Sequence, residues 1–172
     1  FEREVQPVLD KYCVSCHDGS KRDDGRVIAN LDGGQSTLIA YRHGDPEAKI
    51  FEDRPVEELS KSYDAIFQPA YLTLRKYVRV GGLESDLHLL PPMEFHANTN
   101  ELVQMLQKGH HRVKLDAEAW DRLATWIDLN APCHGTWGEF TRISGDQRKK
   151  RQDLRKLYAG VDEDAETAPR IE

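Results

Sequence analysis

Cysteine is scarce in this chain, with three among 172 residues. Cys13 and Cys16 form a local pair, and Cys133 lies far away in the sequence. A secreted scaffold that is held together by disulfides usually has more cysteines, and an even number of them. The sequence therefore predicts that no disulfide framework supports the fold.

Long hydrophobic runs and an excess of positive charge are also missing. No apolar run approaches the roughly 20 residues that a membrane-spanning helix needs, and the formal net charge is −6. Domains that bind nucleic acid usually carry clustered positive charge. We therefore expect neither a membrane span nor a nucleic-acid partner.

The chain begins Phe1-Glu2-Arg3, with neither an initiator methionine nor a signal-peptide pattern. We interpret it as a processed protein or as a segment of a longer one. GxSxG, HExxH and phosphate-loop motifs are absent from the sequence, so no common hydrolase or nucleotide-binding pattern is present. The modest apolar fraction predicts a small core, which a buried prosthetic group would enlarge.

The spacing of apolar residues predicts several short helices. The first ends at Tyr12, and its regular part should begin close to Gln6, because Pro7 is tolerated only in a first turn. Residues 36–54 are ambiguous, and residues 18–34 are rich in turn formers and charge, which predicts a loop with a short extended piece at most. Further helices are expected over 56–67, 70–78, and "TNELVQMLQKG", with Thr99 or Asn98 as its cap and Gly109 as its stop.

The clearest helix follows Asp116, which is a suitable cap. Its apolar stripe recurs at the spacing of one helix face, at Trp120, Leu123, Ala124 and Ile127. After Thr141 the chain becomes highly charged, with a helix-like stretch, "SGDQRKKRQDLRKLYAG", followed by an acidic linker. We therefore expect a domain over residues 1–140 and a tail over residues 141–172, which could lead to a further domain of a parent protein.

The stretch "KYCVSCHDG" contains Cys13, Cys16 and His17 within five residues. Cys-x-x-Cys-His is the attachment motif of c-type haem. Two thiols at this spacing reach the two vinyl groups of one haem, and the adjacent histidine binds the iron axially. The motif therefore predicts one covalently bound haem c.

Two other uses of the motif are weaker. A redox CxxC pair usually lies beside a βαβ pattern, and none is visible here. A zinc ribbon needs a second ligand pair, and Cys133-His134 stands at a spacing that common ribbons do not use. The sequence thus favours haem over a redox pair or zinc.

A helix before CxxCH and a strong aromatic-bearing helix near the end resemble the cytochrome c fold. The blocks "LLPPMEFHANTNELVQMLQKGHHRVKL" and "EAWDRLATWIDLNAPCHGTW" further resemble the planctomycete-type c-type cytochrome domains. These are similar to the C-terminal haem domain of the hydrazine synthase alpha subunit. The resemblance covers residues 4–16 and about 89–138, and residues 18–85 match only vaguely.

The resemblance implies a mainly α, cytochrome c-like fold around one covalent haem, with a long loop-rich insertion between the haem motif and the distal-ligand region. The first and last helices would cross, with Trp120, Trp126 and Ile127 at the crossing, against the haem or in the core. Relatives occur in large exported proteins, some with formylglycine-generating-enzyme-like domains. A periplasmic or otherwise exported location follows, with a redox partner protein or another domain of the parent as the electron partner.

The second axial ligand decides the function, because a sixth ligand favours electron transfer and an open position favours ligand binding or catalysis. His110 follows Gly109 at a helix end, and the matching histidine of the resembled domains looks like the distal ligand of a bis-histidine haem. Met93 follows two prolines in an irregular segment, from which cytochromes c often deliver a methionine. The weaker candidates are His96, His111, His43, His88 and Met105.

Electron transfer is the favoured function, and an enzyme is the less favoured one. A peroxidase-like or nitrogen-oxide-handling haem enzyme would need an open iron position and an acid–base group, for which Glu94 and His96 are available. A gas-sensing domain would need the open position alone. The loop carboxylates Asp18, Asp23, Asp24 and Asp32 raise a calcium question, but their spacing does not match an EF-hand, which favours solvated loop charge.

Overall fold

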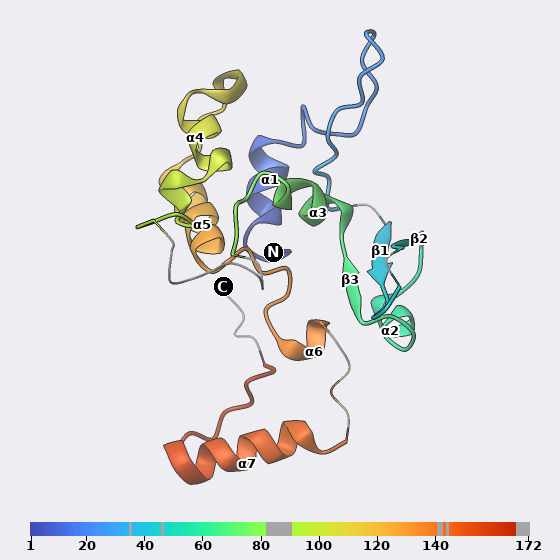
Figure 1. The fold of residues 1–172 in the computed structure, drawn as a ribbon, viewed down its shortest axis with the longest axis vertical. Helices are drawn as coiled ribbons and strands as arrows, with labels where there is room; N and C mark the ends of the chain where they lie inside the picture. Colours follow the sequence, from blue (N-terminus) through green and yellow to red (C-terminus); the bar gives the residue numbers. More distant parts are fainter. Residues whose placement is uncertain (35, 46, 82–90, 141–142, 144, 168–172) are drawn as a thin grey trace. The chain divides into compact units, whose positions relative to one another are not determined.

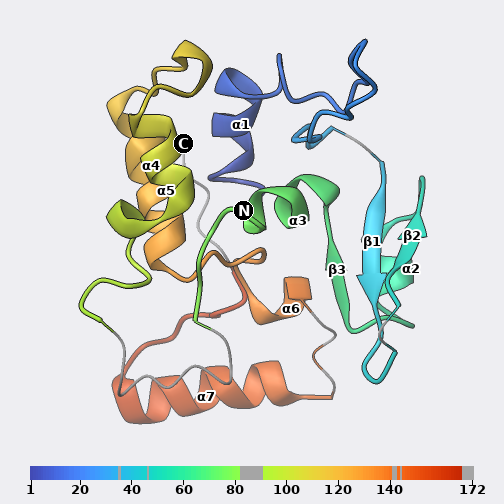
Figure 2. The same cartoon turned by 45° about the horizontal axis from the view of Figure 1, so that its top comes forward.

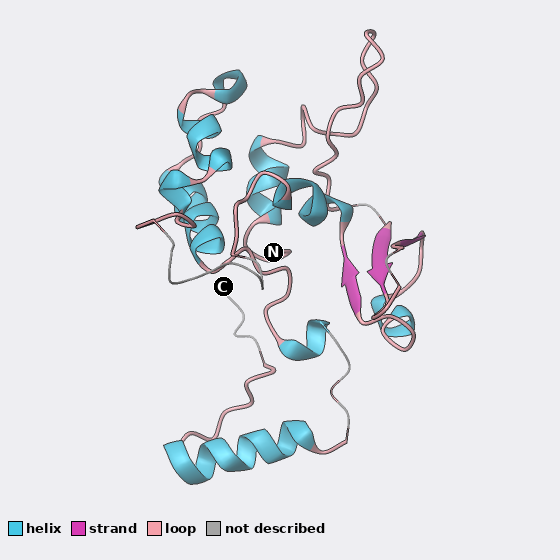
Figure 3. Cartoon of the chain, in the orientation of Figure 1, coloured by secondary structure: helices cyan, strands magenta, loops and turns pink. Residues whose placement is uncertain are grey.

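The computed structural model of the chain is mainly helical with one small sheet (Figures 1 and 3). It describes residues 1–34, 36–45, 47–81, 91–140, 143 and 145–167. The expected mainly α class is confirmed at this coarse level. The packing of the chain forms two compact units, one of residues 1–37 and 67–133 and the other of residues 38–66 and 134–172.

The first helix, α1 (Gln6–Tyr12), begins at the predicted residue, with Pro7 in its first turn. Proline fits there because its missing N–H would have no partner inside the helix. Val8 and Leu9 are buried, whereas the first cysteine of the motif, Cys13, ends the helix as its C-cap. The helix therefore anchors the CxxCH segment to the core of the first unit.

The helix α4 (Glu101–Gln107) is capped by Asn100, and not by Thr99 or Asn98 as the sequence predicts. The residues before it form the short 3-10 helix η1 (Ala97–Thr99), which shifts the start of α4 by one residue. Gly109 is the expected stop, because its φ of 92° lies in the left-handed region that glycine adopts without strain. The 3-10 turn η2 (His110–Arg112) follows directly.

The longest helix of the first unit is α5 (Ala117–Asp128), and its cap is Asp116 as predicted. Leu123, Trp126 and Ile127 are buried, and Trp120 is half-buried beside them. The residues of the predicted stripe are thus buried or half-buried. Trp126, which is not part of that stripe, is buried as well. Both α4 and α5 contact η1.

The core of the first unit joins α1, α4 and α5 to α3 (Pro69–Arg75). Leu9 and Ile127 are 2% and 1% exposed, so α1 and α5 meet through fully buried side chains. The hydroxyl of Tyr71 donates a hydrogen bond to the carbonyl of Ala131 (3.1 Å), and the amino group of Phe1 donates to the carbonyl of Cys133 (2.9 Å). These bonds tie both ends of the unit to its core.

The sheet has three strands, β1 (Leu38–Tyr41), β2 (Lys49–Phe51) and β3 (Ala65–Phe67), in the order β2-β1-β3, and all of it except Phe67 belongs to the second unit. β1 and β2 are antiparallel, with Leu38 opposite Phe51. The sequence predicts one helix over 56–67, and this expectation is wrong. The helix is the single turn α2 (Val56–Leu59), because residues 65–67 pair as a strand instead.

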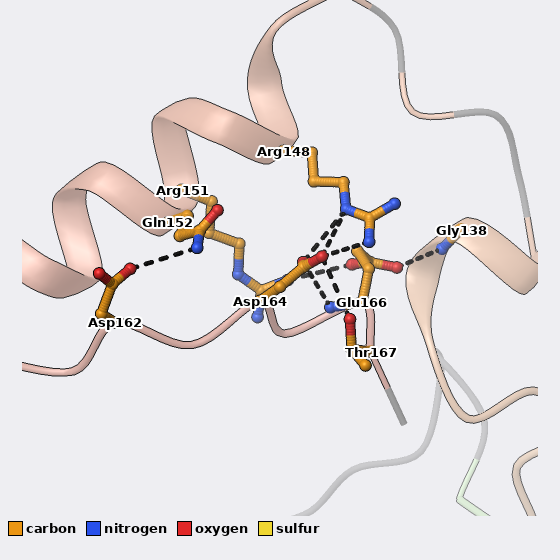
Figure 4. Close-up of polar contacts among 8 residues, drawn as sticks. All are labelled: Gly138, Arg148, Arg151, Gln152, Asp162, Asp164, Glu166 and Thr167. Carbon is orange, nitrogen blue, oxygen red and sulfur yellow. Dashed lines mark hydrogen bonds and ion pairs between the residues drawn. The ribbon is translucent and has the colours of Figure 1, made fainter. Parts of the chain in front are cut away.

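The charged stretch after residue 144 forms the helix α7 (Gln147–Ala159), as predicted, and a short helix α6 (Trp137–Phe140) precedes it. An acidic segment folds back along α7, and Figure 4 shows Arg148 and Arg151 reaching Asp164 and Glu166. No large apolar side chain of α7 is buried. Its described contacts are therefore mainly ionic, and the domain boundary expected near residue 140 stays a prediction.

Among the described residues, no helix combines the length and the apolar character that crossing a membrane requires.

Candidate functional site

The CxxCH segment continues directly from α1 as a series of tight turns. The amide of Cys13 donates to the carbonyl of Leu9 (2.8 Å), which extends the helical pattern by one residue. The carbonyl of Cys13 then accepts from the amides of Cys16 (3.1 Å) and His17 (2.9 Å). His17 therefore stands one turn beyond Cys13, at a position fixed by the backbone.

The two cysteines of the motif have different surroundings. Cys13 is half-buried and packs against the core, whereas Cys16 is exposed, and neither forms a disulfide. Burial, with a smaller contribution from Cys16, raises the pKa of the Cys13 thiol to about 11. The C-terminal end of α1 adds the negative end of a helix dipole, which also disfavours a thiolate.

A neutral first thiol is the opposite of what a redox CxxC pair requires. In such pairs the first cysteine is a low-pKa thiolate, often at a helix N-terminus. Cys13 instead ends a helix and is protonated at neutral pH. The geometry therefore disfavours the redox alternative for Cys13 and Cys16.

The described residues contain no group of three or more His, Cys, Asp or Glu side chains gathered to hold a metal ion. A structural zinc site gathers four such ligands around one point. The side chains of Cys13, Cys16 and His17 do not converge in that way. The motif instead contains a thiol packed against the core (Cys13), an exposed thiol (Cys16) and the imidazole of His17.

The imidazole of His17 lies beside that of His110, which comes from the turn after α4. The two ring centres are 5.9 Å apart and the ring planes are within 26° of parallel. Figures 1 and 2 both show this turn (yellow) at the same end of the unit as the C-terminal end of α1 (blue). The structure therefore brings together two of the sequence-predicted ligands that are far apart in the chain.

A second backbone segment also holds His17. Its carbonyl accepts a hydrogen bond from the amide of Leu31 (2.9 Å), which closes the loop that follows the motif. Its Nδ1 atom is buried and has no hydrogen-bond partner among the described residues. Such unsatisfied atoms are rare in native proteins and call for a functional explanation.

The turn that carries His110 has an unusual backbone. Gly109, His111 and Arg112 all have positive φ, of 92°, 45° and 66°. The left-handed region costs a residue with a side chain about 1 kcal/mol or more, and such strain clusters at functional sites. The turn bends sharply on both sides of His110, and this directs its ring towards His17.

The charge state of His110 suits a ligand. Burial lowers its pKa, and the neighbouring His111 and His17 lower it further. A neutral imidazole is the form that binds a metal ion. His111, whose ring centre is 4.6 Å from that of His110, is exposed.

Met93 and His96 lie elsewhere in the first unit. Met93 has a φ of 65° and is 47% exposed. Both residues line an open hollow of about 630 Å³, together with Val103, Trp120 and Ala124, among others. The lining of this hollow includes neither His17 nor His110.

The weaker candidates have other surroundings. His43 belongs to the second unit, where its amide donates to a carboxylate oxygen of Asp64 (2.5 Å). Met105 packs against the core of the first unit, and His88 lies outside the described residues.

Three of the loop aspartates accept hydrogen bonds from backbone amides two residues further along the chain. Asp18 accepts from the amide of Ser20 (2.8 Å), Asp24 from that of Arg26 (3.0 Å), and Asp32 from that of Gly34 (2.8 Å). The bond from the Ser20 amide lowers the pKa of Asp18. These acidic side chains stabilise turns, which is the expected role of Asp and Asn in loops.

One part of the site was not found from the sequence. Asp116, predicted only as a helix cap, also accepts hydrogen bonds from Lys11 and Tyr12, the two residues before Cys13. Its spacing to Tyr12 carries no periodic signal, because the contact joins segments that are 104 positions apart. Asp116 thus links the residues before the CxxCH segment to the chain that follows His110.

Comparison with family models, with curated proteins and with solved structures found no match to this chain.

Proposed function

We propose that this chain is an electron-transfer domain that carries one covalently attached c-type haem. In this proposal the thiols of Cys13 and Cys16 would add to the two haem vinyl groups, and His17 and His110 would bind the iron. The observation that supports it most is the pairing of the His17 and His110 rings next to the CxxC pair.

The distance between the rings fits two ligands of one metal ion. A metal–imidazole bond is about 2 Å long, and the ring centre lies roughly 1 Å behind the nitrogen, so two opposed imidazoles have centres roughly 6 Å apart. The observed separation is 5.9 Å. The buried, unpartnered Nδ1 of His17 and the neutral state of His110 also fit this role.

The haem, when bound, supplies a reversible one-electron change at its iron. The chain supplies the rest. Cys13 fixes the attachment to the core, and α1 and α5 hold that core rigid through Leu9 and Ile127. A histidine held on each side needs no ligand exchange between oxidation states, which favours electron transfer over catalysis.

The location and partners rest on the resemblance to exported cytochrome domains. Haem attachment to CxxCH takes place outside the cytoplasm, so we place the protein in the periplasm or another exported compartment. Its electron partner would be a separate redox protein or another domain of the parent protein.

Intact-mass measurement tests covalent attachment. The chain is expressed with c-type maturation machinery, denatured and weighed, and the expected mass exceeds that of the apo-chain by one haem. Cys13→Ala and Cys16→Ala should each weaken the attachment, while Cys133→Ala, the matched control, should keep the full mass. An apo mass for the parent chain would refute the proposal.

Carbon monoxide separates electron transfer from the haem-enzyme and gas-sensor alternatives. With His17 and His110 both bound, the reduced protein should show a low-spin spectrum and bind carbon monoxide only slowly. Rapid binding to the native protein would indicate an open position and favour those alternatives.

A further inference from the structure

The carboxylate of Asp116 joins three groups through its two oxygens. Oδ2 accepts hydrogen bonds from Nζ of Lys11 (2.8 Å) and from the hydroxyl of Tyr12 (2.7 Å). Oδ1 accepts from the amide of Ala119 (2.8 Å) and so caps α5. Oδ1 therefore caps α5, and Oδ2 forms the contact with α1.

The two sides of this contact lead to the two histidines. Lys11 and Tyr12 end α1 immediately before the CxxCH motif, so Tyr12 is five positions from His17. Asp116 ends the connector that starts at His110, six positions earlier. Short segments such as these leave little freedom between the contact and each ring.

We propose that Asp116, acting through Lys11 and Tyr12, is a positioning residue that holds His110 opposite His17. This inference rests on the proposed axial pair.

Packing alone does not fix this arrangement. Leu9 and Ile127 belong to the buried cluster that holds α1 against α5, and apolar contacts of this kind are non-directional, so they do not fix one rotation of the helices. A second ionic link, from Arg122 to Glu4 (3.1 Å), joins the same helices at the start of α1. The Asp116 contact, by comparison, lies at the end of α1 that leads to His17.

The energetics also favour a positioning role. The side chains of Lys11 and Asp116 are 63% and 49% exposed, and exposed ion pairs add little to stability. Lys11 is nevertheless the first cause of a pKa for Asp116 well below its usual range, so the carboxylate stays charged. The contact therefore keeps its charge at neutral pH without being a main support of the fold.

Two variants separate the contact from the helix cap. Asp116→Ser keeps a good cap for α5, because serine is a preferred N-cap residue, but it has no second oxygen for α1. Tyr12→Phe removes the hydroxyl that donates to Oδ2 of Asp116 and accepts from the Asp116 amide (3.4 Å), leaves the Oδ1 cap unchanged and is the milder variant should Asp116→Ser fold poorly. Glu4→Gln is the matched control, since it breaks the other ionic link between α1 and α5.

The haem-loaded protein provides the first measurement. Supporting groups around metal ligands typically change ligand binding by roughly 10-fold or more, so Asp116→Ser should speed carbon monoxide binding to the reduced protein about 10-fold. Tyr12→Phe should change it in the same direction by less, and Glu4→Gln should leave it unchanged. Equal rates in the parent, Asp116→Ser and Glu4→Gln would overturn the inference.

The haem-free chain provides the second measurement and separates the two proposals. Proton contacts between the His17 and His110 rings, observed by NMR as nuclear Overhauser effects, should be lost in Asp116→Ser and retained in Glu4→Gln. If no haem attaches but these contacts depend on Asp116, the proposed function fails and the positioning role stands. If haem attaches and the contacts are unchanged in Asp116→Ser, the positioning role fails alone.

Discussion

The ring of His110 lies 5.9 Å from the ring of His17, centre to centre, within one compact unit of the chain. The sequence left His110 and Met93 as the leading candidates for the second axial ligand. Met93 instead lines an open hollow beside Val103 and Trp120. Single substitutions of His110 and Met93 can therefore identify which of them is the second axial ligand.

His110→Ala should convert the haem spectrum from low spin to high spin and open the iron to carbon monoxide. The physical reason is that the sixth ligand is lost while His17 and the thioethers remain. Met93→Ala and His111→Ala should keep the low-spin spectrum, and His111→Ala is the closest control because it changes the adjacent residue. The reverse pattern, with Met93→Ala giving high spin, would identify Met93 as the ligand.

The helix α7 and the acidic segment after it should be separable from the haem site. α7 buries no large apolar side chain, and its basic residues pair with residues 162–166 of the same unit. Brief trypsin treatment should therefore cut within α7 and leave the haem spectrum unchanged. Loss of the spectrum in step with the cleavage would contradict the predicted division near residue 140.

Asn100 should be important for stability because it is 1% exposed and bonds in two directions. Its Oδ1 accepts from the amide of Leu102 (3.2 Å), and its Nδ2 donates to the carbonyl of Arg79 (3.4 Å). Asn100→Ala removes a helix cap and leaves a buried amide unpaired, so the free energy of unfolding should fall by about 2 kcal/mol. Urea denaturation measures this change.

Asn98→Ala is the matched control for Asn100→Ala. Asn98 is exposed and stands two positions earlier. Its replacement should change the unfolding free energy by less than about 0.5 kcal/mol. Equal losses for the two variants would mean that Asn100 does not act as the cap.

The contribution of Asp116 to stability should depend on pH in a defined direction. Its pKa is lowered, chiefly by Lys11, so the stabilisation is complete above the unfolded value of about 3.9 and is lost as the pH falls towards the folded value. The pKa of Lys11 is raised, chiefly by Asp116, so its contribution is lost only as the pH rises above about 10.4.

Denaturant unfolding of the parent chain and of Asp116→Ser tests this dependence. The difference in unfolding free energy between them should be constant from about pH 5 to pH 9 and should shrink below about pH 4. Glu4→Gln serves again as the comparison. A difference that grows as the pH falls would show that the carboxylate does not gain its charge-dependent stability from Lys11.

The sequence predicted those parts of the fold that depend on local rules. The start of α1 follows from Pro7, the cap of α5 from Asp116, and the end of α4 from Gly109. Each signal lies within a few residues of the feature that it determines, which is why a single sequence contains it.

The parts that the sequence did not predict depend on contacts between distant segments. The strand β3 (Ala65–Phe67) continues a helix-like pattern from residue 56 and becomes a strand only through pairing in the sheet. The contact between Asp116 and Tyr12 has no local signal at all. For the candidate site, the sequence named His17 and His110 but had no means of showing that their rings lie together.

The turn at Gly109 yields the sharpest test of how His110 is directed. The φ of Gly109 is 92°, and a Cβ atom added there would meet no atom within 4 Å. The cost of Gly109→Ala is therefore that of a left-handed backbone for alanine, about 1 kcal/mol, without any steric clash. Relief of that strain would rotate the turn and move the imidazole of His110 away from His17.

Gly160 is the matched control for Gly109, because it also follows a helix with positive φ (68°) and open space around its Cβ position. Both alanine variants should lose a similar amount of local stability. Only Gly109→Ala should also raise the high-spin fraction of the haem and speed carbon monoxide binding, both measured by optical spectroscopy. If Gly109→Ala keeps the low-spin spectrum and the slow binding of the parent, the left-handed turn does not determine the position of His110.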